Sequence, residues 1–371
     1  MELLLSDEQK LLRDSAATLV ERGAGPKRAR ELRDNGEQTD RSAWRDVADA
    51  GWLGILADEN AGGLALGMTE LSLVVEQAGS GLMAAPIAAA AVAAWALGDG
   101  DSVTLRDEIA PAVIAGDLIV VAALQEQRQG VELDDISTTA TADGTGLGMS
   151  GSKIFIRDPG AIDGFLVNAA GPEGPVLCYV AGDADGVSMD IAAGNVDGGA
   201  SGTLNLNNVA VGQAHILAGP NRAPGMTDDI HNRMLLGLGA ELLGVMEQAL
   251  DTTIEYLKIR EQFDRPIGSF QALQHRAVDN YVEVETTRSL LYQVCAASDD
   301  GRGSLAMASA VKARASGAAL SVTKSAIQMH GAIGFTDEHD IGFYLKRAMA
   351  LSAAYGNEAA HRARFARLSD A

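Results

Sequence analysis

Helical periodicity dominates the first part of the chain. Apolar residues recur every three to four positions from Ser6 to about Ile114, as in SDEQKLLRDSAATLVERG and MTELSLVVEQAG. This spacing predicts amphipathic helices, and Ser6 and Thr69 are typical N-cap residues at their starts. The stretch APIAAAAVAAWALG is continuously apolar rather than striped. A helix of that composition is expected to be buried on most sides.

The pattern changes between about Asp117 and Leu217. Short apolar runs such as LIVVAAL, GSKIFIRD and PVLCYVA alternate with Gly, Pro or Asp, and they are rich in Val, Ile and Phe. Alternation with a period of two, punctuated by turn residues, is typical of strands. The segment is therefore predicted to form a small antiparallel β domain, a barrel or a sandwich.

Helical periodicity returns at about Met226 and continues almost to the end. The first helix is predicted to be longer than roughly 25 residues and to stop before Pro266, which cannot continue it. Three more helical segments follow, at residues 271–297, 305–331 and 342–367. Four long helices with short connections predict an antiparallel four-helix bundle.

These patterns predict an α+β fold that is mainly α. An N-terminal helical domain is expected at residues 1–115, a middle β domain at 116–220 and a four-helix bundle domain at 221–371. A chain of 371 residues exceeds the usual size of one hydrophobic core. Because only 4% of the residues are aromatic and Gly occurs 42 times, the core must consist of small side chains and closely approaching backbones.

The charge balance narrows the possible partners. Lys and Arg number 29 and Asp and Glu 50, a net charge of −21, which argues against binding to nucleic acid or an anionic membrane. An anionic ligand such as coenzyme A must therefore bind through local basic residues or helix N-termini. Cys178 and Cys295 lie in unrelated contexts, so neither a disulfide nor a metal site is predicted.

The first residues and the hydropathy of the chain bear on its location. MELLLSDEQK lacks the features of a signal or transit peptide. No run approaches the roughly 20 apolar residues of a transmembrane helix. A cytoplasmic protein without a membrane-spanning helix is therefore expected.

Four segments resemble the acyl-CoA dehydrogenase family and occur in the family's order: WRDVADAGWLGILADENAGG, GSKIFIRD, YLKIREQFDRPIGSFQALQHR and QMHGAIGFTDEHDIGFYLKRAM. The resemblance spans nearly the whole chain. It implies an oxidoreductase and flavoprotein of lipid metabolism that performs FAD-dependent α,β-dehydrogenation of an acyl-CoA thioester. It also implies electron-transfer flavoprotein or another acceptor as a partner.

The resemblance further implies an oligomer, because dimers of the family bury FAD between subunits. The adenosine diphosphate end is held by the first bundle turn of the neighbouring subunit and by a facing loop. A guanidinium suits the diphosphate, amides donate hydrogen bonds and a phenyl ring stacks. The matching positions here are Arg260, Gln262, Phe263, Ile267, Gln271, Gln328, His330, Gly331 and Ala332. For the flavin ring they are Gln125, Phe155 and Arg157.

The catalytic base departs from the family pattern. The reaction requires a base for the α proton, donors for the thioester oxygen and a flavin that accepts hydride. Many members carry the base as a Glu on the final loop, where this chain has Gly356. A smaller group carries it early on the first bundle helix, where this chain has Met234. Both usual positions therefore lack a carboxylate.

Three replacements for the base are conceivable. Glu241 lies seven residues after Met234, on the same helix face and roughly 10 Å further along. It is either a catalytic residue or part of a structural ion pair in the bundle. Glu358 lies two residues beyond Gly356 and matches a family position that usually approaches the flavin diphosphate, which a carboxylate would repel. The third source is a different subunit.

Three functions are compatible with this set of residues. The first is an FAD-dependent acyl-CoA dehydrogenase that acts through Glu241 or another carboxylate. The second is a non-catalytic partner subunit that completes the FAD site of a heteromeric dehydrogenase. The expected assembly is either a homo-oligomer, a dimer or a tetramer, or a heterotetramer with a related subunit. The third is an acyl-CoA oxidase-like flavoenzyme. In lacking the usual base, the chain resembles subunits of actinobacterial heteromeric dehydrogenases that act on steroid side-chain CoA thioesters. The expected process is therefore either β-oxidation of fatty acids or steroid catabolism.

Overall fold

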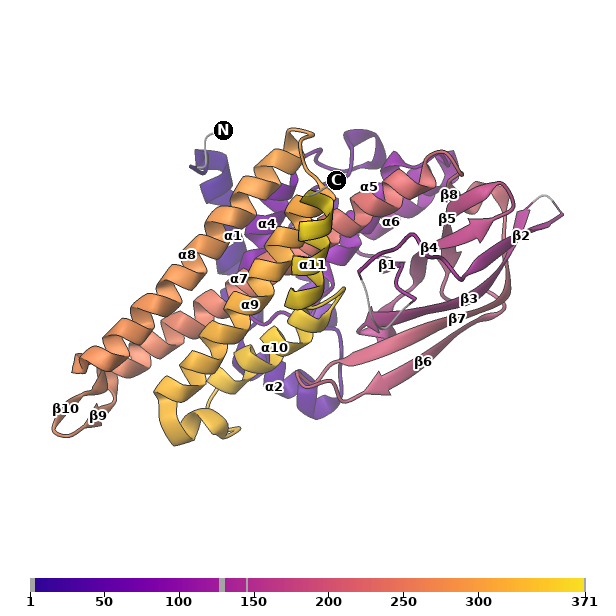
Figure 1. Cartoon of the computed structure of the whole chain (residues 1–371). Coiled ribbons are helices and arrows are strands. Elements are labelled where there is room, and N and C mark those ends of the chain that lie inside the picture. Colours follow the sequence, from indigo (N-terminus) through magenta and orange to yellow (C-terminus); the bar gives the residue numbers. More distant parts are fainter. Residues whose placement is uncertain (1–3, 127–130, 145, 370–371) are drawn as a thin grey trace. The chain divides into compact units, whose positions relative to one another are not determined.

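Helices form both ends of the chain and strands form its middle (Figure 1). The computed structural model describes residues 4–126, 131–144 and 146–369. The chain divides into two compact units. The bundle unit contains Met1–Glu31, Ser72–Met83 and Leu235–Ala371, and the sheet unit contains Leu32–Leu71 and Ala84–Met234. The predicted change from helix to strand and back is confirmed, whereas the three domain boundaries stay a prediction.

The helices before the sheet are α1 (Asp7–Gly23), α2 (Pro26–Asn35), α3 (Arg41–Asp49), α4 (Met68–Ser80), α5 (Ile87–Asp99) and α6 (Ala110–Ile114). Ser6 caps α1 as predicted, because its hydroxyl accepts the Gln9 N–H at 3.2 Å and the Gln9 side chain accepts the Ser6 N–H at 2.9 Å. Thr69 is not an N-cap, since α4 already begins at Met68. The predicted burial of α5 is confirmed, with eight of its 13 residues buried.

The sheet unit contains β1 (Val120–Ala123), β2 (Thr139–Asp143), β3 (Gly146–Arg157), β4 (Gly164–Gly171), β5 (Gly174–Ala181), β6 (Val187–Ala193), β7 (Ala200–Val211) and β8 (Ile216–Ala218). Its strand order is β6-β7-β3-β2-β4-β5-β8, and β1 pairs with β4. The strands pair antiparallel as predicted, except that β4 runs parallel to β1 and to the start of β2. The parallel pairing is possible because the β2–β3 hairpin lies between β1 and β4 in the sequence and provides the long crossover that it requires.

The last part of the chain contains α7 (Ala223–Ile259), β9 (Glu261–Gln262), β10 (Arg265–Pro266), α8 (Gln271–Asp299), α9 (Leu305–His330), α10 (Ile341–Ala353) and α11 (Glu358–Ser369). The predicted single helix at 342–367 is wrong, because it is broken into α10 and α11. Tyr355 and Gly356 adopt φ values of 53° and 104° at the break, in a region that helices do not visit. In the bundle unit α9 packs against α8, α10 and α11.

Two glycines allow α4 and α7 to cross at backbone contact inside the bundle unit. A Cβ atom at Gly244 would overlap the carbonyl oxygen of Glu76, and one at Gly79 would overlap the carbonyl oxygen of Glu241. Any side chain at either position would push the two helices apart. The crossing therefore fixes where the acidic side chains of α4 and α7 lie.

Three further observations concern hydropathy and chemistry. In the described parts of the chain, no helix is long and apolar enough to cross a bilayer, and no three His, Cys, Asp or Glu side chains group as a metal site would require. Cys178 and Cys295 are both buried, and burial raises the pKa of the Cys178 thiol to about 12. The cytoplasmic location stays a prediction.

Gly244→Ala should lower the free energy of unfolding by about 2 kcal/mol or more, because overpacking at a backbone contact outweighs the better helix propensity of Ala. Gly225→Ala is the matched control in the same helix, since a Cβ there meets nothing within 4 Å. The control should be neutral or slightly stabilising. Urea unfolding of both variants tests this. Equal free energies of unfolding for Gly244→Ala and Gly225→Ala would contradict the backbone contact between α4 and α7.

Candidate functional site

The turn after α7 carries most of the residues predicted to bind the adenine end of FAD. Phe263 and Asp264 form the tip of the β9–β10 hairpin with φ values of 56° and 60°, the left-handed conformation that a two-residue hairpin turn requires. The Ile267 N–H donates to the Arg260 carbonyl at 2.8 Å and closes the loop. The hairpin is therefore held by backbone hydrogen bonds, and Phe263 and Arg265 add side-chain contacts with Phe270.

The side chains of this turn face outward on the bundle unit. Phe263 is 85% exposed, and Arg260, Gln262 and Gln271 are exposed as well. The Phe263 ring meets Phe270 edge-on at 6.0 Å between centroids. One short segment thus presents a guanidinium, two amides and an aromatic face. The contacts of these groups with FAD stay a prediction.

An aromatic stack joins the second predicted loop to the same end of α7. Tyr256 stacks on His330 at 4.4 Å between centroids, and its hydroxyl donates to the His330 carbonyl at 3.3 Å. His339 meets the His330 ring at 4.5 Å. His330 is 4% exposed, and burial lowers its pKa, which favours the neutral imidazole. Its observed contacts join the two loops.

The exposed residues of this second loop surround His330 in sequence. Gln328 is exposed on the last turn of α9, and Gly331, with φ of 70°, ends the helix. Ala332 follows in the short turn and is also exposed. Because Tyr256 and His330 are in contact, the two predicted adenine-end segments lie at the same end of the bundle unit. Their role in FAD binding stays a prediction.

The predicted flavin-ring residues lie in the sheet unit. The Ile154 N–H donates to the Gln125 carbonyl at 2.7 Å, which places Gln125 beside β3. Phe155, the next residue on β3, has φ of 60° and is 46% exposed. It lies where the β3–β7 register shifts, between Lys153 and Ile156. Gln125 thus lies against the residue before Phe155, with Arg157 further along the strand, and the flavin contacts of all three stay a prediction.

Glu241 forms an ion pair in the bundle unit. Arg347 on α10 donates to Glu241 Oε1 from Nε at 2.9 Å and from Nη2 at 2.5 Å. Both side chains are largely buried, with exposed fractions of 17% and 15%. This is the structural pair expected as one alternative. A carboxylate held by a guanidinium is a poor proton acceptor, and catalysis by Glu241 stays a prediction.

Two buried basic side chains hold the loop that carries Gly356. Lys312 Nζ donates to Ser316 Oγ and to the carbonyls of Ser352 and Gly356, each at 3.0 Å. His361 Nε2 lies 2.9 Å from the Tyr355 carbonyl. Lys312 and His361 have no exposed surface. The positive φ values of this loop are therefore maintained by specific hydrogen bonds rather than by chance packing.

A cavity of about 600 Å³ lies beside this loop, between α9, α10 and α11. Lys324 and Arg362 line it together with Glu358. Glu358 Oε1 pairs with Arg362 Nη2 at 2.5 Å. A Cβ at Gly317 would lie 2.7 Å from Glu358 Oε2, so the absence of a side chain at Gly317 makes room for this carboxylate. The charged lining of the cavity is thus two basic side chains and one carboxylate, which is paired with one of them.

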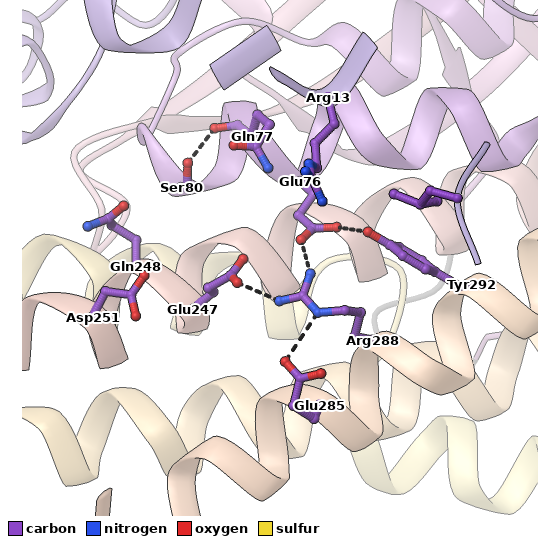
Figure 2. A pocket seen from close by; sticks show the side chains of 11 residues that line it. Arg13, Glu76, Gln77, Ser80, Glu247, Gln248, Asp251, Glu285, Arg288 and Tyr292 are labelled. Atoms are coloured by element: carbon purple, nitrogen blue, oxygen red, sulfur yellow. Dashed lines mark hydrogen bonds and ion pairs between the residues drawn. The ribbon is translucent and has the colours of Figure 1, made fainter. Parts of the chain in front are cut away.

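A second cavity, of about 460 Å³, lies between α1, α4, α7 and α8. Figure 2 shows Arg288 at its centre, bonded to Glu76, to Glu247 at 2.6 Å and to Glu285 at 3.4 Å. The Tyr292 hydroxyl donates to Glu76 at 2.9 Å. Burial raises the pKa of Glu247 to about 7. The charge of Arg288 lowers this pKa, and the nearby Glu76 carboxylate raises it. Three carboxylates thus share one guanidinium and tie α4, α7 and α8 together.

Comparison with known proteins decides the family. Residues 6–117 match the family model described as "Acyl-CoA dehydrogenase, N-terminal domain", and residues 231–369 match "Acyl-CoA dehydrogenase, C-terminal domain". "Acyl-CoA dehydrogenase FadE27" of Mycobacterium tuberculosis is 31% identical over 350 residues, which cover 91% of each chain. The chain belongs to the acyl-CoA dehydrogenase family.

Two solved structures of the family share the whole fold. The first, named "Tcur3481-Tcur3483 steroid ACAD G363A variant", is 32% identical with a TM-score of 0.88 and covers 98% of both chains. The second, the ChsE4-ChsE5 complex of Mycobacterium tuberculosis, is 29% identical with a TM-score of 0.90 and covers 100% of both. The predicted acyl-CoA dehydrogenase fold and FAD-dependent acyl-CoA dehydrogenation are confirmed at the level of the family.

Sequence reasoning missed the basic partners of this acyl-CoA dehydrogenase. Arg347 and Lys312 each lie in a mostly apolar helical stretch, close to a second basic residue, Lys346 or Arg314. Lys153 within GSKIFIRD and Glu126 within LQEQ were also passed over. A charged residue within a mostly apolar helical stretch indicates a buried ion pair, because a buried charge requires a partner. The sequence does not identify that partner.

Acid should destabilise the chain through His361. Burial lowers the pKa of His361 from its usual 6.5 to about 4, and Lys312 adds to this effect. Because the unfolded chain then binds the proton more tightly, the stability contributed by neutral His361 is present above pH 6.5 and is lost as pH falls toward 4. The loss amounts to about 3 kcal/mol.

Urea unfolding at a series of pH values between 7 and 4 measures this loss. His361→Gln should flatten the profile, whereas His275→Gln, at an exposed position on α8, should keep the wild-type slope. Parallel profiles for wild type and His361→Gln would show that other groups cause the acid sensitivity.

Proposed function

We propose that this chain is one subunit of a heteromeric, FAD-dependent acyl-CoA dehydrogenase, and that a related subunit supplies the base that removes the α proton. One observation carries the proposal. At the usual base position the loop holds Gly356 at φ of 104°, with its carbonyl bound by Lys312. Its backbone is thus fixed in a conformation that disfavours a residue with a side chain.

The carboxylates considered as replacements already bind arginines. Glu241 is held by Arg347 and Glu358 by Arg362. Abstraction of the α proton requires a carboxylate that is poised to accept it. A base from another subunit meets this requirement without breaking either ion pair.

The adenine-end segment fits the group that it is proposed to hold. Arg260 provides a planar donor for a diphosphate, Gln262 and Gln271 provide amides, and Phe263 provides an exposed ring. When bound, FAD supplies the acceptor for the β hydride. The chain's own contribution is to bind and orient the adenosine diphosphate end, in a site that a neighbouring subunit shares. Gln328, Gly331 and Ala332 are proposed to border the same end.

The relatives support a paired assembly. ChsE4-ChsE5 is named as a complex, and Tcur3481-Tcur3483 is named as a pair and as a steroid ACAD. By this likeness the proposed partner is a related acyl-CoA dehydrogenase chain, and the proposed substrate is a bulky, steroid-type CoA thioester. Electron-transfer flavoprotein or another acceptor would reoxidise the flavin.

The chain purified alone and loaded with FAD should not be bleached by acyl-CoA thioesters under anaerobic conditions. A panel from short acyl chains to steroid side-chain thioesters, followed by visible flavin absorbance, tests this. In the complex copurified with its partner, Glu241→Gln should change the bleaching rate by less than about twofold. If the isolated chain is bleached and Glu241→Gln abolishes the bleaching, the chain is a self-sufficient dehydrogenase. Rapid oxygen consumption would instead indicate an oxidase.

Arg260→Ala should weaken FAD binding roughly 10- to 100-fold, because it removes charge-assisted hydrogen bonds to a diphosphate. Fluorescence titration of the assembled protein with FAD measures the change. Arg302→Ala is the control, since Arg302 is also exposed but lies beyond the other end of α8. Equal affinities of the two variants would remove Arg260 from the site.

A further inference from the structure

A buried ion pair fixes the segment that carries Gln125. Lys153 Nζ donates to Glu126 Oε1 at 2.6 Å and to Asn168 Oδ1 at 2.7 Å. The Lys153 side chain has no exposed surface and that of Glu126 is 8% exposed. Burial raises the pKa of Glu126, but its bonds to Lys153, Thr138 and Ser137 outweigh this and bring the value down to about 2. Burial also lowers the pKa of Lys153, to about 8, so both members of the pair are charged at neutral pH.

The Glu126 carboxylate joins three segments of the sheet unit. It accepts the backbone N–H groups of Ser137, at 2.5 Å, and Thr138, at 3.0 Å, just before β2. It also accepts a hydrogen bond from the Lys153 ammonium on β3, and Glu126 itself follows β1 in the sequence. Together with the bond from Ile154 to Gln125, this carboxylate sets how the end of the β1 segment lies against β3.

The backbone beside this pair is strained. Phe155, two residues after Lys153, adopts φ of 60°, which is unfavourable for a bulky side chain. The β3–β7 register shifts between Lys153 and Ile156. Such conformations persist only where the surroundings determine them. Lys153 anchors one side of the shift, and the ring of Phe155 is left 46% exposed at the surface.

We propose that Lys153 and Glu126 are positioning residues for the flavin ring: they hold Gln125 beside Phe155 so that the two side chains form one preorganised face. The inference rests on the proposed flavin contacts of Gln125 and Phe155. A buried ion pair adds little net stability compared with apolar residues. Its use here is to set the register of two segments, which apolar packing specifies less well.

The test uses the FAD-loaded protein in its natural assembly and three variants. Lys153→Met should lower FAD affinity at least about tenfold and shift the visible spectrum and reduction potential of the bound flavin. It should also destabilise the fold, since it leaves Glu126 buried without its ammonium. The double variant Lys153→Met with Glu126→Gln should recover thermal stability but not the wild-type flavin spectrum. Arg222→Met, which breaks an exposed ion pair of the same unit, should leave the flavin unchanged.

The outcomes separate this inference from the proposed function. Recovery of both stability and flavin spectrum in the double variant would show that the pair is only structural. Phe155→Ala tests the face itself. If Phe155→Ala alters the flavin and Lys153→Met does not, the positioning role is wrong while the proposed flavin face stands. If Phe155→Ala has no effect, the assigned face and the inference built on it both fail.

Discussion

The contact between α4 and α7 at Gly79 and Gly244 is the constraint on which the bundle unit depends. Because no Cβ separates the helices there, Glu76 of α4 lies close enough for Arg288 of α8 to bind it together with Glu247 of α7. A wider crossing would leave Glu76, which is 1% exposed, buried without its guanidinium, at a cost of several kcal/mol. The ion pairs of Arg288 therefore depend on the two glycines that let α4 and α7 approach each other.

The same arrangement limits the chemistry of this chain. Carboxylates that enter the bundle are neutralised by arginines: Glu76 by Arg288, and Glu241 by Arg347. Pairing keeps the buried charges compatible with a low-dielectric interior. It makes Glu241 a poor proton acceptor, whereas the pKa of Glu247 beside Arg288 is raised to about 7. Where a dehydrogenase requires an available base, this chain has a glycine, and Lys312 holds that glycine's carbonyl. The loop at Gly356 thus offers no carboxylate, in agreement with the proposed base from a second subunit.

Much of the fold followed from sequence, and most of the ion pairs did not. Periodicity predicted α7 and the sheet, because local patterning depends on which faces are buried. It missed the break at Tyr355 and Gly356, since apolar residues continue on both sides and the break is stabilised by Lys312, distant in sequence. Glu241 was recognised as unusual, yet Arg347 lies 106 residues away. The motif assignments of Arg260 and Phe263 came from resemblance, and they stay predictions because exposure does not identify a ligand.

The exposure of that hairpin carries the argument for an assembly. An aromatic ring gains stacking and burial energy only when a partner covers both it and the ligand. Phe263 is 85% exposed and Phe335, in the facing loop, 80% exposed, while Tyr256 and His330 hold the two loops together from beneath. The exposed apolar rings on this rigid support are unfavourably hydrated in the isolated subunit. Their burial on assembly then contributes to the free energy of binding. The adenine-end residues are consequently expected to act on a cofactor that a neighbouring subunit helps to enclose, and subunit pairing is expected to strengthen FAD binding.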